Sequence, residues 1–218
     1  MKRKNNIESA LCDTRVVAII RGCSRDECLK LCEAYALGGI RLVEVTFNQR
    51  SPETWRDTAE TIRVLKERFT KEMCVGGGTV MRMDQLDMLC DSGGEFMVSP
   101  NVSVELIRES VRRDLVAMPG VLTPSEAVVA SEAGAQFVKL FPAGSLGSEY
   151  VKAICAPLSH ISFLAVGGVG HNNAAAFIKA GCVGVGVGGN LTNKEWIAAG
   201  EWEKISAAAK ELVERTHV

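Results

Sequence analysis

Short apolar runs rich in β-branched residues recur along the chain roughly every 20 to 30 residues. Each run ends near Gly, Pro, Thr or Asn and is followed by a segment with helical periodicity. Eight such runs occur, at residues 16–20, 41–46, 73–76, 96–99, 115–118, 136–140, 161–166 and 183–187. Alternation of strand and helix over eight units predicts an α/β fold, the TIM (β/α)8 barrel.

The apolar runs are continuous, as expected for parallel strands that are buried on both faces. An open doubly wound sheet would show the same pattern and is the competing architecture. Helix starts carry capping residues at Ser51-Pro52, at Thr123-Pro124 and at Asn172 or Asn173, and Gly181 marks a helix end. Residues 1–14 are predicted to form a helix that caps the barrel, and residues 201–215 a closing helix.

Composition favours one domain with a large core. The chain has 218 residues, 47% hydrophobic and 23% charged, and it contains no Ser/Pro-rich linker. We therefore expect residues 1–218 to form a single barrel domain. Basic and acidic residues are spread along the chain and leave a net charge of −1, so we expect no nucleic-acid or membrane partner.

The N-terminus and the cysteines bear on location and metal content. Polar and acidic residues follow the basic start at residues 1–4, so no signal peptide is expected, and no apolar run reaches the roughly 20 residues of a membrane span. The 8 cysteines form no C-x-x-C pair and lie apart from the 3 histidines, which is poor spacing for a metal site. We expect reduced, mostly buried thiols, a cytoplasmic protein, and no metal or other cofactor.

Lys139 interrupts an apolar run near the carboxyl end of the sixth predicted strand. Burial lowers the pKa of a lysine because the charged form loses hydration, and the neutral amine can attack a ketone. The alternative is a lysine that snorkels from the rim to solvent. Phe137 and Phe141 share its face by strand period, which favours burial. Lys139 is therefore a candidate nucleophile.

Glu44 is the matching feature of the second predicted strand, a carboxylate among apolar residues. Burial alone would raise its pKa, and a nearby protonated amine would lower it, so Glu44 and Lys139 could tune one another in one barrel mouth. That arrangement suits a general acid/base. A structural salt bridge to a barrel Arg or Lys is the alternative interpretation.

Arg21 and Thr79 follow the first and third predicted strands. The Arg21 guanidinium could bind a carboxylate in bidentate fashion or pair with Glu44. Thr79 follows three glycines, at 76–78, whose lack of side chains favours the close approach of a ligand, although a tight turn is the plainer explanation.

Glycine-rich loops follow the seventh and eighth predicted strands, at residues 167–170 and 184–190. In barrels, loops at these two positions commonly bind a phosphate through backbone N–H groups and a helix N-terminus. Glycines retained for packing alone are the alternative. Gly168, Gly188 and Gly189 are the candidate phosphate ligands.

Five motifs recur together in this chain: Val-Glu-Val-Thr at 43–46, Gly-Gly-Gly-Thr-Val at 76–80, Ser-Pro-Asn at 99–101, Val-Lys-Leu-Phe-Pro-Ala at 138–143 and Gly-Gly-Val at 167–169. With them the chain resembles the class I 2-keto-3-deoxy-6-phosphogluconate/4-hydroxy-2-oxoglutarate aldolase family, which includes the 6-phosphogalactonate aldolases. The resemblance covers nearly the whole chain.

The resemblance implies a lyase with defined roles for the candidate residues. Lys139 would form a Schiff base with a 2-keto acid, and Glu44 would act as acid/base directly or through water. Arg21 and Thr79 would bind near the pyruvyl end. The glycines of the two loops would hold the phosphate. The resemblance also implies a metal-free homotrimer.

Three positions depart from the gluconate-type pattern, which has Arg, Thr and Ser where this chain has Asn48, Val166 and Gly189. Asn48, still a substrate-binding candidate, removes a positive charge from the pyruvate end. Asn48 and Val166 resemble the galactonate type, whereas the Val-Thr pair at 45–46 resembles the gluconate type, so both epimers stay open. Gly189 supplies no side-chain hydroxyl to a phosphate.

The sequence thus predicts an aldolase that reversibly cleaves a 2-keto-3-deoxy-6-phospho sugar acid to pyruvate and glyceraldehyde 3-phosphate. A phosphosugar isomerase or epimerase on the same barrel would use Glu44 without covalent chemistry at Lys139. A non-catalytic barrel that binds sugar-acid phosphates is the third possibility, motivated by Asn48 and Gly189.

Overall fold

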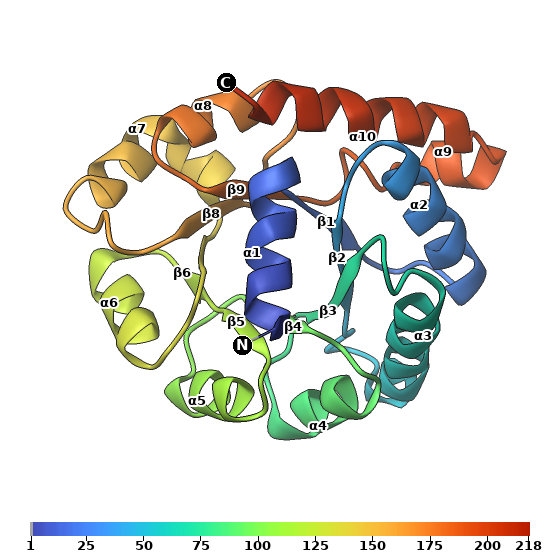
Figure 1. The fold of residues 1–218 in the computed structure, drawn as a ribbon, viewed down its shortest axis with the longest axis horizontal. Helices are drawn as coiled ribbons and strands as arrows, with labels where there is room; N and C mark the ends of the chain where they lie inside the picture. Colours follow the sequence, from blue (N-terminus) through green and yellow to red (C-terminus); the bar gives the residue numbers. More distant parts are fainter. Residues whose placement is uncertain (1) are drawn as a thin grey trace.

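The fold is a parallel sheet that curls into a barrel surrounded by helices, as Figure 1 shows for the computed structural model, which describes residues 2–218. The strand order is β5-β4-β3-β2-β1-β9-β8-β7-β6. The strands are β1 Val16–Ile20, β2 Leu42–Thr46, β3 Cys74–Gly78, β4 Phe96–Val98, β5 Val116–Met118, β6 Gly120–Val121, β7 Val138–Leu140, β8 Phe163–Val166 and β9 Gly184–Val187.

Helices connect successive strands and cover the outside of the barrel (Figure 1). They are α1 Lys2–Thr14, α2 Arg25–Leu37, the 3₁₀ turn η1 Pro52–Thr54, α3 Trp55–Arg68, α4 Met83–Asp91, α5 Val104–Arg112, α6 Pro124–Glu132, α7 Ala143–Cys155, α8 Ala174–Lys179, α9 Lys194–Ala199 and α10 Trp202–Thr216. Among the described residues no helix has the length and apolar character needed to cross a bilayer.

The barrel closes through β5 and β6, which are two halves of one strand interrupted by Pro119. The first half pairs with β4 and the second half with β7. Proline has no N–H to donate, but its carbonyl accepts a hydrogen bond from the Lys139 N–H at 2.9 Å. The two ends of the strand order are therefore consecutive in the chain, and the closed barrel is confirmed over the open doubly wound sheet.

Every one of the eight predicted runs overlaps an observed strand, with ends that differ by at most two residues. The main extension is β3, which continues through Gly77 and Gly78 where the sequence suggested the end of the strand. The separate β6 is the element that apolar periodicity missed, because a two-residue strand after a proline carries no periodic signal.

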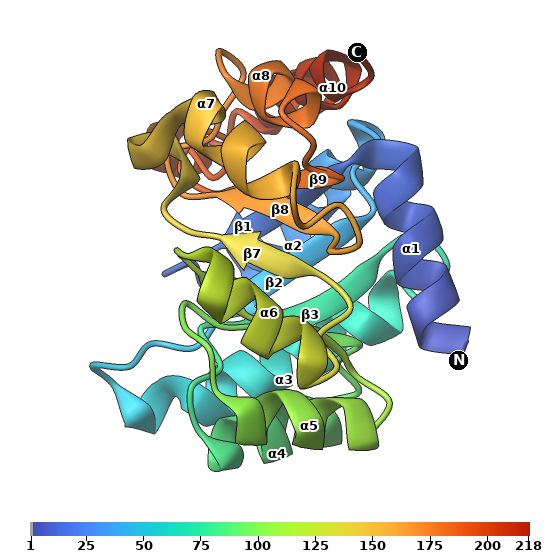
Figure 2. The same ribbon diagram turned by 90° about the vertical axis from the view of Figure 1, so that its left-hand side faces the viewer.

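Two apolar clusters lie on either side of the sheet. Alternate residues of each strand point outward against the helices, and the others point into the barrel, where Val17, Leu42 and Phe96 belong to the inner cluster. Ile7 and Leu11 of α1 join that inner cluster. Helix α1 thus closes the N-terminal end of the barrel, and Figure 2 shows it lying across that end, as predicted for the capping helix.

The predicted helix starts are present in the structure. Thr123 forms a capping box with Glu126 at the start of α6, and an equivalent box joins Ser24 and Glu27 at the start of α2. Ser51-Pro52 opens the η1 turn rather than the α-helix itself. Asn173 precedes α8, but its side chain accepts from the N–H of Gly170 instead of capping the helix.

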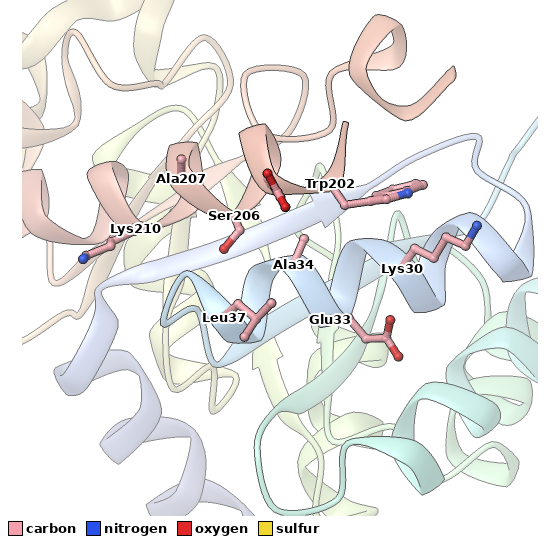
Figure 3. A pocket seen from close by; sticks show the side chains of 9 residues that line it. Lys30, Glu33, Ala34, Leu37, Trp202, Ser206, Ala207 and Lys210 are labelled. Atoms are coloured by element: carbon pink, nitrogen blue, oxygen red, sulfur yellow. The ribbon is translucent and has the colours of Figure 1, made fainter. Parts of the chain in front are cut away.

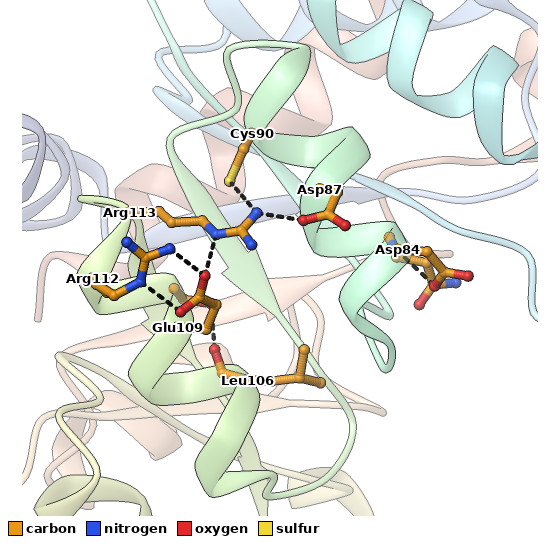
Figure 4. Close-up of polar contacts among 9 residues, drawn as sticks. Asp84, Asp87, Cys90, Leu106, Glu109, Arg112 and Arg113 are labelled. Carbon is orange, nitrogen blue, oxygen red and sulfur yellow. Dashed lines mark hydrogen bonds and ion pairs between the residues drawn. The ribbon is translucent and has the colours of Figure 1, made fainter.

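Charged side chains join neighbouring helices on the outer surface. Arg113, just after α5, donates to Asp87 of α4 and to Glu109 of its own helix, both at 2.6 Å (Figure 4). Arg112 adds a second, bidentate pair with Glu109. Ion pairs this close to solvent each add little stability, and of these only the Arg113–Asp87 pair joins α4 to α5.

Candidate active site at the mouth of the barrel

Lys139 lies on the inner face of β7 and is only 8% exposed. Phe137 on the same face belongs to the inner apolar cluster, while Val138 and Leu140 pack outward. The ammonium nitrogen lies 4.8 Å from the ring centre of Phe141. A lysine that snorkels into solvent is therefore contradicted. Burial is the main cause that lowers the pKa of Lys139; the charge of Glu44 raises it and that of Arg21 lowers it.

Glu44 lies on the inner face of β2 and is 3% exposed. Burial raises its pKa, and the charges of Lys139 and Arg21 act in the opposite direction. Within the described part of the chain, no ion pair or hydrogen bond joins the Glu44 carboxylate to either cation. Glu44 and Lys139 line one small internal cavity together with Val166. The carboxylate and the amine thus share a water-poor space, where each shifts the proton affinity of the other.

The three glycines of β3 leave room for protein side chains. A Cβ at Gly76 would lie 2.4 Å from the Phe96 ring, and one at Gly77 would lie 2.9 Å from Leu89. A Cβ at Gly78 would lie 2.7 Å from Oε1 of Glu44. The expectation that these glycines admit a ligand is therefore wrong. They are small because an aromatic ring, a leucine and the candidate acid/base occupy the space.

Arg21 and Thr79 meet at the open end of the barrel. Nη2 of Arg21, one residue past β1, donates to Oγ1 of Thr79 at 3.1 Å. Thr79 follows β3 with a φ of +57°, in the left-handed region that β-branched residues rarely adopt. The pair presents a guanidinium and a hydroxyl above the buried lysine and glutamate, a combination suited to a carboxylate.

The loops after β8 and β9 lie side by side at the same end, joined by a hydrogen bond of 3.0 Å from Nδ2 of Asn190 to the carbonyl of Val169. Gly168 has a φ of +72°, which requires glycine, whereas a Cβ at Gly189 would meet nothing within 4 Å. Among the hydrogen bonds of the described chain, none uses the N–H of Gly168, Val169 or Gly189. These N–H groups are available to an anion.

Asn48 is hydrogen-bonded within its own loop and to the start of α3. Its Oδ1 accepts the N–H of Arg50 at 3.0 Å, and its carbonyl accepts Nε1 of Trp55 at 2.7 Å. It also lines a groove whose other walls include Gly22, Thr46 and Asp57. The residue that reaches the site from this loop is Gln49, which donates to the carbonyl of Thr79 at 2.7 Å. Sequence reasoning missed Gln49 because a polar loop residue carries no signal of its partner.

Outside the barrel mouth, the described residues form a further surface groove but no metal site. A surface groove runs between α2 and α10 and is lined by Ala34, Leu37 and Trp202 with charged residues at its rim (Figure 3). Nothing in it pairs a buried amine with an acid. No group of three His, Cys, Asp or Glu side chains in the described residues could hold a metal ion.

Comparison with known proteins places the chain among the aldolases. The family model for KDPG and KHG aldolase matches residues 7–208. The chain belongs to this family. It is therefore an aldolase, a carbon–carbon lyase.

Relatives of this aldolase come from several bacteria. It is 38% identical to the 2-dehydro-3-deoxy-6-phosphogalactonate aldolase of Escherichia coli (strain K12), over 81% of this chain and 83% of that protein. It is 28% identical to the KHG/KDPG aldolase of the same strain, over 97% and 96% of the two chains. A structure described as native KDPGal matches with a TM-score of 0.82 and 34% identity, covering 92% of this aldolase and 93% of that chain.

A second similar structure is that of an aldolase with a phosphorylated ligand. The 2-keto-3-deoxy-6-phosphogluconate aldolase of Zymomonas mobilis ZM4 with 3-phosphoglycerate has a TM-score of 0.80 and 25% identity, covering 96% of this aldolase and 95% of that chain. Both matches cover more than nine-tenths of this aldolase.

Proposed function

We propose that this aldolase reversibly cleaves a 2-keto-3-deoxy-6-phospho sugar acid to pyruvate and glyceraldehyde 3-phosphate, with Lys139 as the Schiff-base nucleophile and Glu44 as the acid/base. The observation that carries the proposal is the buried amine of Lys139 facing the same internal cavity as the buried carboxylate of Glu44. Only a neutral amine attacks a ketone, and burial favours the neutral form.

In the proposed reaction, Lys139 attacks the C2 ketone, and loss of water gives an iminium. Glu44 takes the proton of the C4 hydroxyl as the C3–C4 bond breaks, which releases glyceraldehyde 3-phosphate and leaves an enamine. Return of a proton from Glu44 to C3 and hydrolysis of the iminium then release pyruvate and regenerate the amine. A carboxyl whose pKa burial raises is suited to both proton transfers.

Binding of the substrate is proposed to use both sides of the barrel mouth. The Arg21–Thr79 pair would bind the substrate carboxylate. The free N–H groups of the loops containing Gly168, Gly188 and Gly189 would bind the phosphate. The structure of the similar Zymomonas enzyme with 3-phosphoglycerate supports a phosphate-bearing substrate. Asn48, whose oxygen accepts the Arg50 N–H, would offer its amide Nδ2 as a donor to the substrate.

We further propose that the galactonate epimer is preferred. Support comes from the higher identity to the phosphogalactonate aldolase, 38% against 28% for the KHG/KDPG enzyme of the same strain, and from Val166, which lines the cavity beside Lys139. A coupled assay for pyruvate release, run on both phosphorylated epimers and on 4-hydroxy-2-oxoglutarate, tests this. A higher kcat/KM for the gluconate epimer would contradict it.

The mechanism is tested by borohydride reduction in the presence of pyruvate. We expect a three-carbon adduct on the peptide that contains Lys139, and near-total loss of turnover in Lys139→Arg. No mass gain on that peptide, or substantial turnover by the arginine variant, would refute Schiff-base catalysis and favour an isomerase-type reaction.

A cytoplasmic homotrimer is the proposed working form. The family resemblance supports the trimer, and the eight free thiols fit a reducing compartment. Light scattering on the purified protein should give three times the mass of one chain, and a monomer mass would contradict the trimer.

A further inference from the structure

Gln49 belongs to a loop that is tied both to the barrel and to helix α3. On one side, the buried Phe47 donates its N–H to the carbonyl of Gly78 at 2.9 Å. On the other, Nε1 of Trp55 donates to the carbonyl of Asn48 at 2.7 Å. These bonds hold the loop after β2 over the end of β3, so the side chain of Gln49 has a defined starting point.

The side-chain amide of Gln49 is hydrogen-bonded to the backbone of Thr79. Its Nε2 donates to the Thr79 carbonyl at 2.7 Å. Thr79 needs such support because its φ of +57° is unfavourable for a β-branched residue. Just beyond it, Val80 is anchored by its own N–H to the carbonyl of Val98 at 3.0 Å. Thr79 is thus held from both sides in a conformation it would otherwise avoid.

The conformation of Thr79 sets the geometry of the Arg21 pair. Oγ1 of Thr79 accepts Nη2 of Arg21 at 3.1 Å only while this backbone is kept. Arg21 and Thr79 together supply a guanidinium and a hydroxyl to the carboxylate end of the site. A shift of Thr79 would therefore act directly on binding of the 2-keto acid.

We propose that Gln49 is a positioning residue that holds Thr79 in the left-handed conformation and thereby keeps the Arg21–Thr79 pair in place for the carboxylate of the 2-keto acid. The proposal rests on the proposed function for that pair. In this proposal the role of Gln49 differs from those of Lys139 and Glu44, because its side chain is hydrogen-bonded to Thr79 and not to either of them. Loss of Gln49 should weaken binding of the keto acid and leave the bond-breaking step largely intact.

The first test compares Gln49→Leu, which keeps the side-chain length without a donor, with Arg50→Ala in the same loop. Arg50 contributes only its backbone N–H to the hydrogen bonds of the described chain, and alanine retains that group. We expect Gln49→Leu to raise KM, and the pyruvate concentration that half-saturates borohydride trapping, by about two- to tenfold, the effect of one lost hydrogen bond. We expect kcat to stay within about twofold of wild type and the melting temperature to fall by no more than about 2–4 °C. We expect Arg50→Ala to behave like the wild type in all of these measurements.

The second test asks whether Gln49 acts through Thr79 or touches the substrate itself. Glycine adopts a positive φ freely, so in a Thr79→Gly background Gln49 has no strained residue to hold. We expect Thr79→Gly to raise KM and the added Gln49→Leu to raise it no further. A full, multiplicative effect of Gln49→Leu in that background would show direct contact with substrate and overturn the positioning role.

The outcomes separate this proposal from the one on which it rests. If wild-type protein traps pyruvate on Lys139 but Gln49→Leu shows the same concentration dependence, the role of Gln49 is refuted and the Schiff-base mechanism stands. If the wild type traps no pyruvate, both proposals fall. If Gln49→Leu lowers kcat and leaves KM unchanged, Gln49 serves the bond-breaking step and the proposal is wrong.

Discussion

Gly78 provides the sharpest test of how the barrel holds Glu44. A Cβ at this position would lie 2.7 Å from Oε1 of Glu44 and 2.8 Å from Cγ2 of Thr46. Gly78→Ala therefore places a methyl group where the carboxylate lies. The backbone of Gly78 has no positive φ, so alanine fits its conformation and the effect comes from the contact alone.

The contact distances set the size of the effect. Ordinary van der Waals contact begins at 3.4 Å, so the Glu44 carboxylate must retreat by about 0.7 Å or the strand must move. Displacements near 1 Å cost roughly 100-fold in rate for positioned groups, so we expect kcat/KM to fall by about 10- to 100-fold. Overpacking should also cost about 1–3 kcal/mol of stability, or about 2–4 °C in Tm for each kcal/mol.

Gly77→Ala is the matched control. It adds the same methyl group one residue away, on the outer face of β3, where Leu89 at 2.9 Å is the nearest neighbour. We expect a comparable loss of Tm with kcat/KM within about threefold of wild type, since flexible leucine atoms absorb the contact. Pyruvate release from the phosphorylated epimers and a thermal melt measure both quantities on each variant.

Two results would refute the reasoning. Wild-type activity in Gly78→Ala would mean that Glu44 moves without consequence, so its position does not matter to the reaction. Equal activity losses in Gly77→Ala and Gly78→Ala would mean that general overpacking of β3, and not the Glu44 contact, is responsible.

Two further predictions concern charge and phosphate. The charge of Glu44 raises the pKa of Lys139, so Glu44→Gln should lower that pKa further and move the pH midpoint of equilibrium pyruvate trapping to lower pH. The charge of Arg21 lowers the same pKa, so Arg21→Met should move the midpoint to higher pH. An unchanged midpoint in Glu44→Gln would mean that the carboxyl is already neutral. Gly189→Ser adds a hydroxyl where a Cβ meets nothing within 4 Å, so KM for the phosphorylated substrate should fall by about two- to tenfold with no change in Tm, and a rise in KM would contradict a phosphate at this loop.

The positions of Lys139 and Glu44 could be predicted because strand period decides them. In a strand with both faces buried, a charged residue at an inward position has nowhere to go except the barrel interior. Phe137 on the same face as Lys139 carried the same information, whereas Phe141 lies past the end of β7 and is 38% exposed. Strand periodicity, however, predicts only which face of the sheet a side chain points from, and not what it contacts. The sequence could not say that Glu44 and Lys139 share one cavity without an ion pair.

The glycines show where sequence reasoning stops. Residues 76–78 read as open backbone, yet each makes room for a different side chain, and only Gly78 concerns the site. Gly168 needs a positive φ, whereas Gly189 is unconstrained. All five are glycine in the sequence, and what distinguishes them is their own backbone conformation and the side chains packed against them from other parts of the chain. Long-range packing of that kind leaves no local pattern.

The same argument explains why Gln49 was found only in three dimensions. A glutamine in a polar loop is ordinary, and its importance comes from Thr79, 30 residues away, whose left-handed backbone is equally invisible in sequence. Lys139 and Glu44 lie in regular strands, so strand periodicity predicts where they point. Gln49 and Thr79 lie in loops, where no local sequence pattern predicts their conformation or contacts. Substrate binding at the carboxylate end should therefore be more sensitive to changes in the 47–51 loop than the identity of its residues suggests, and Gln49→Leu against Arg50→Ala measures that sensitivity within one loop.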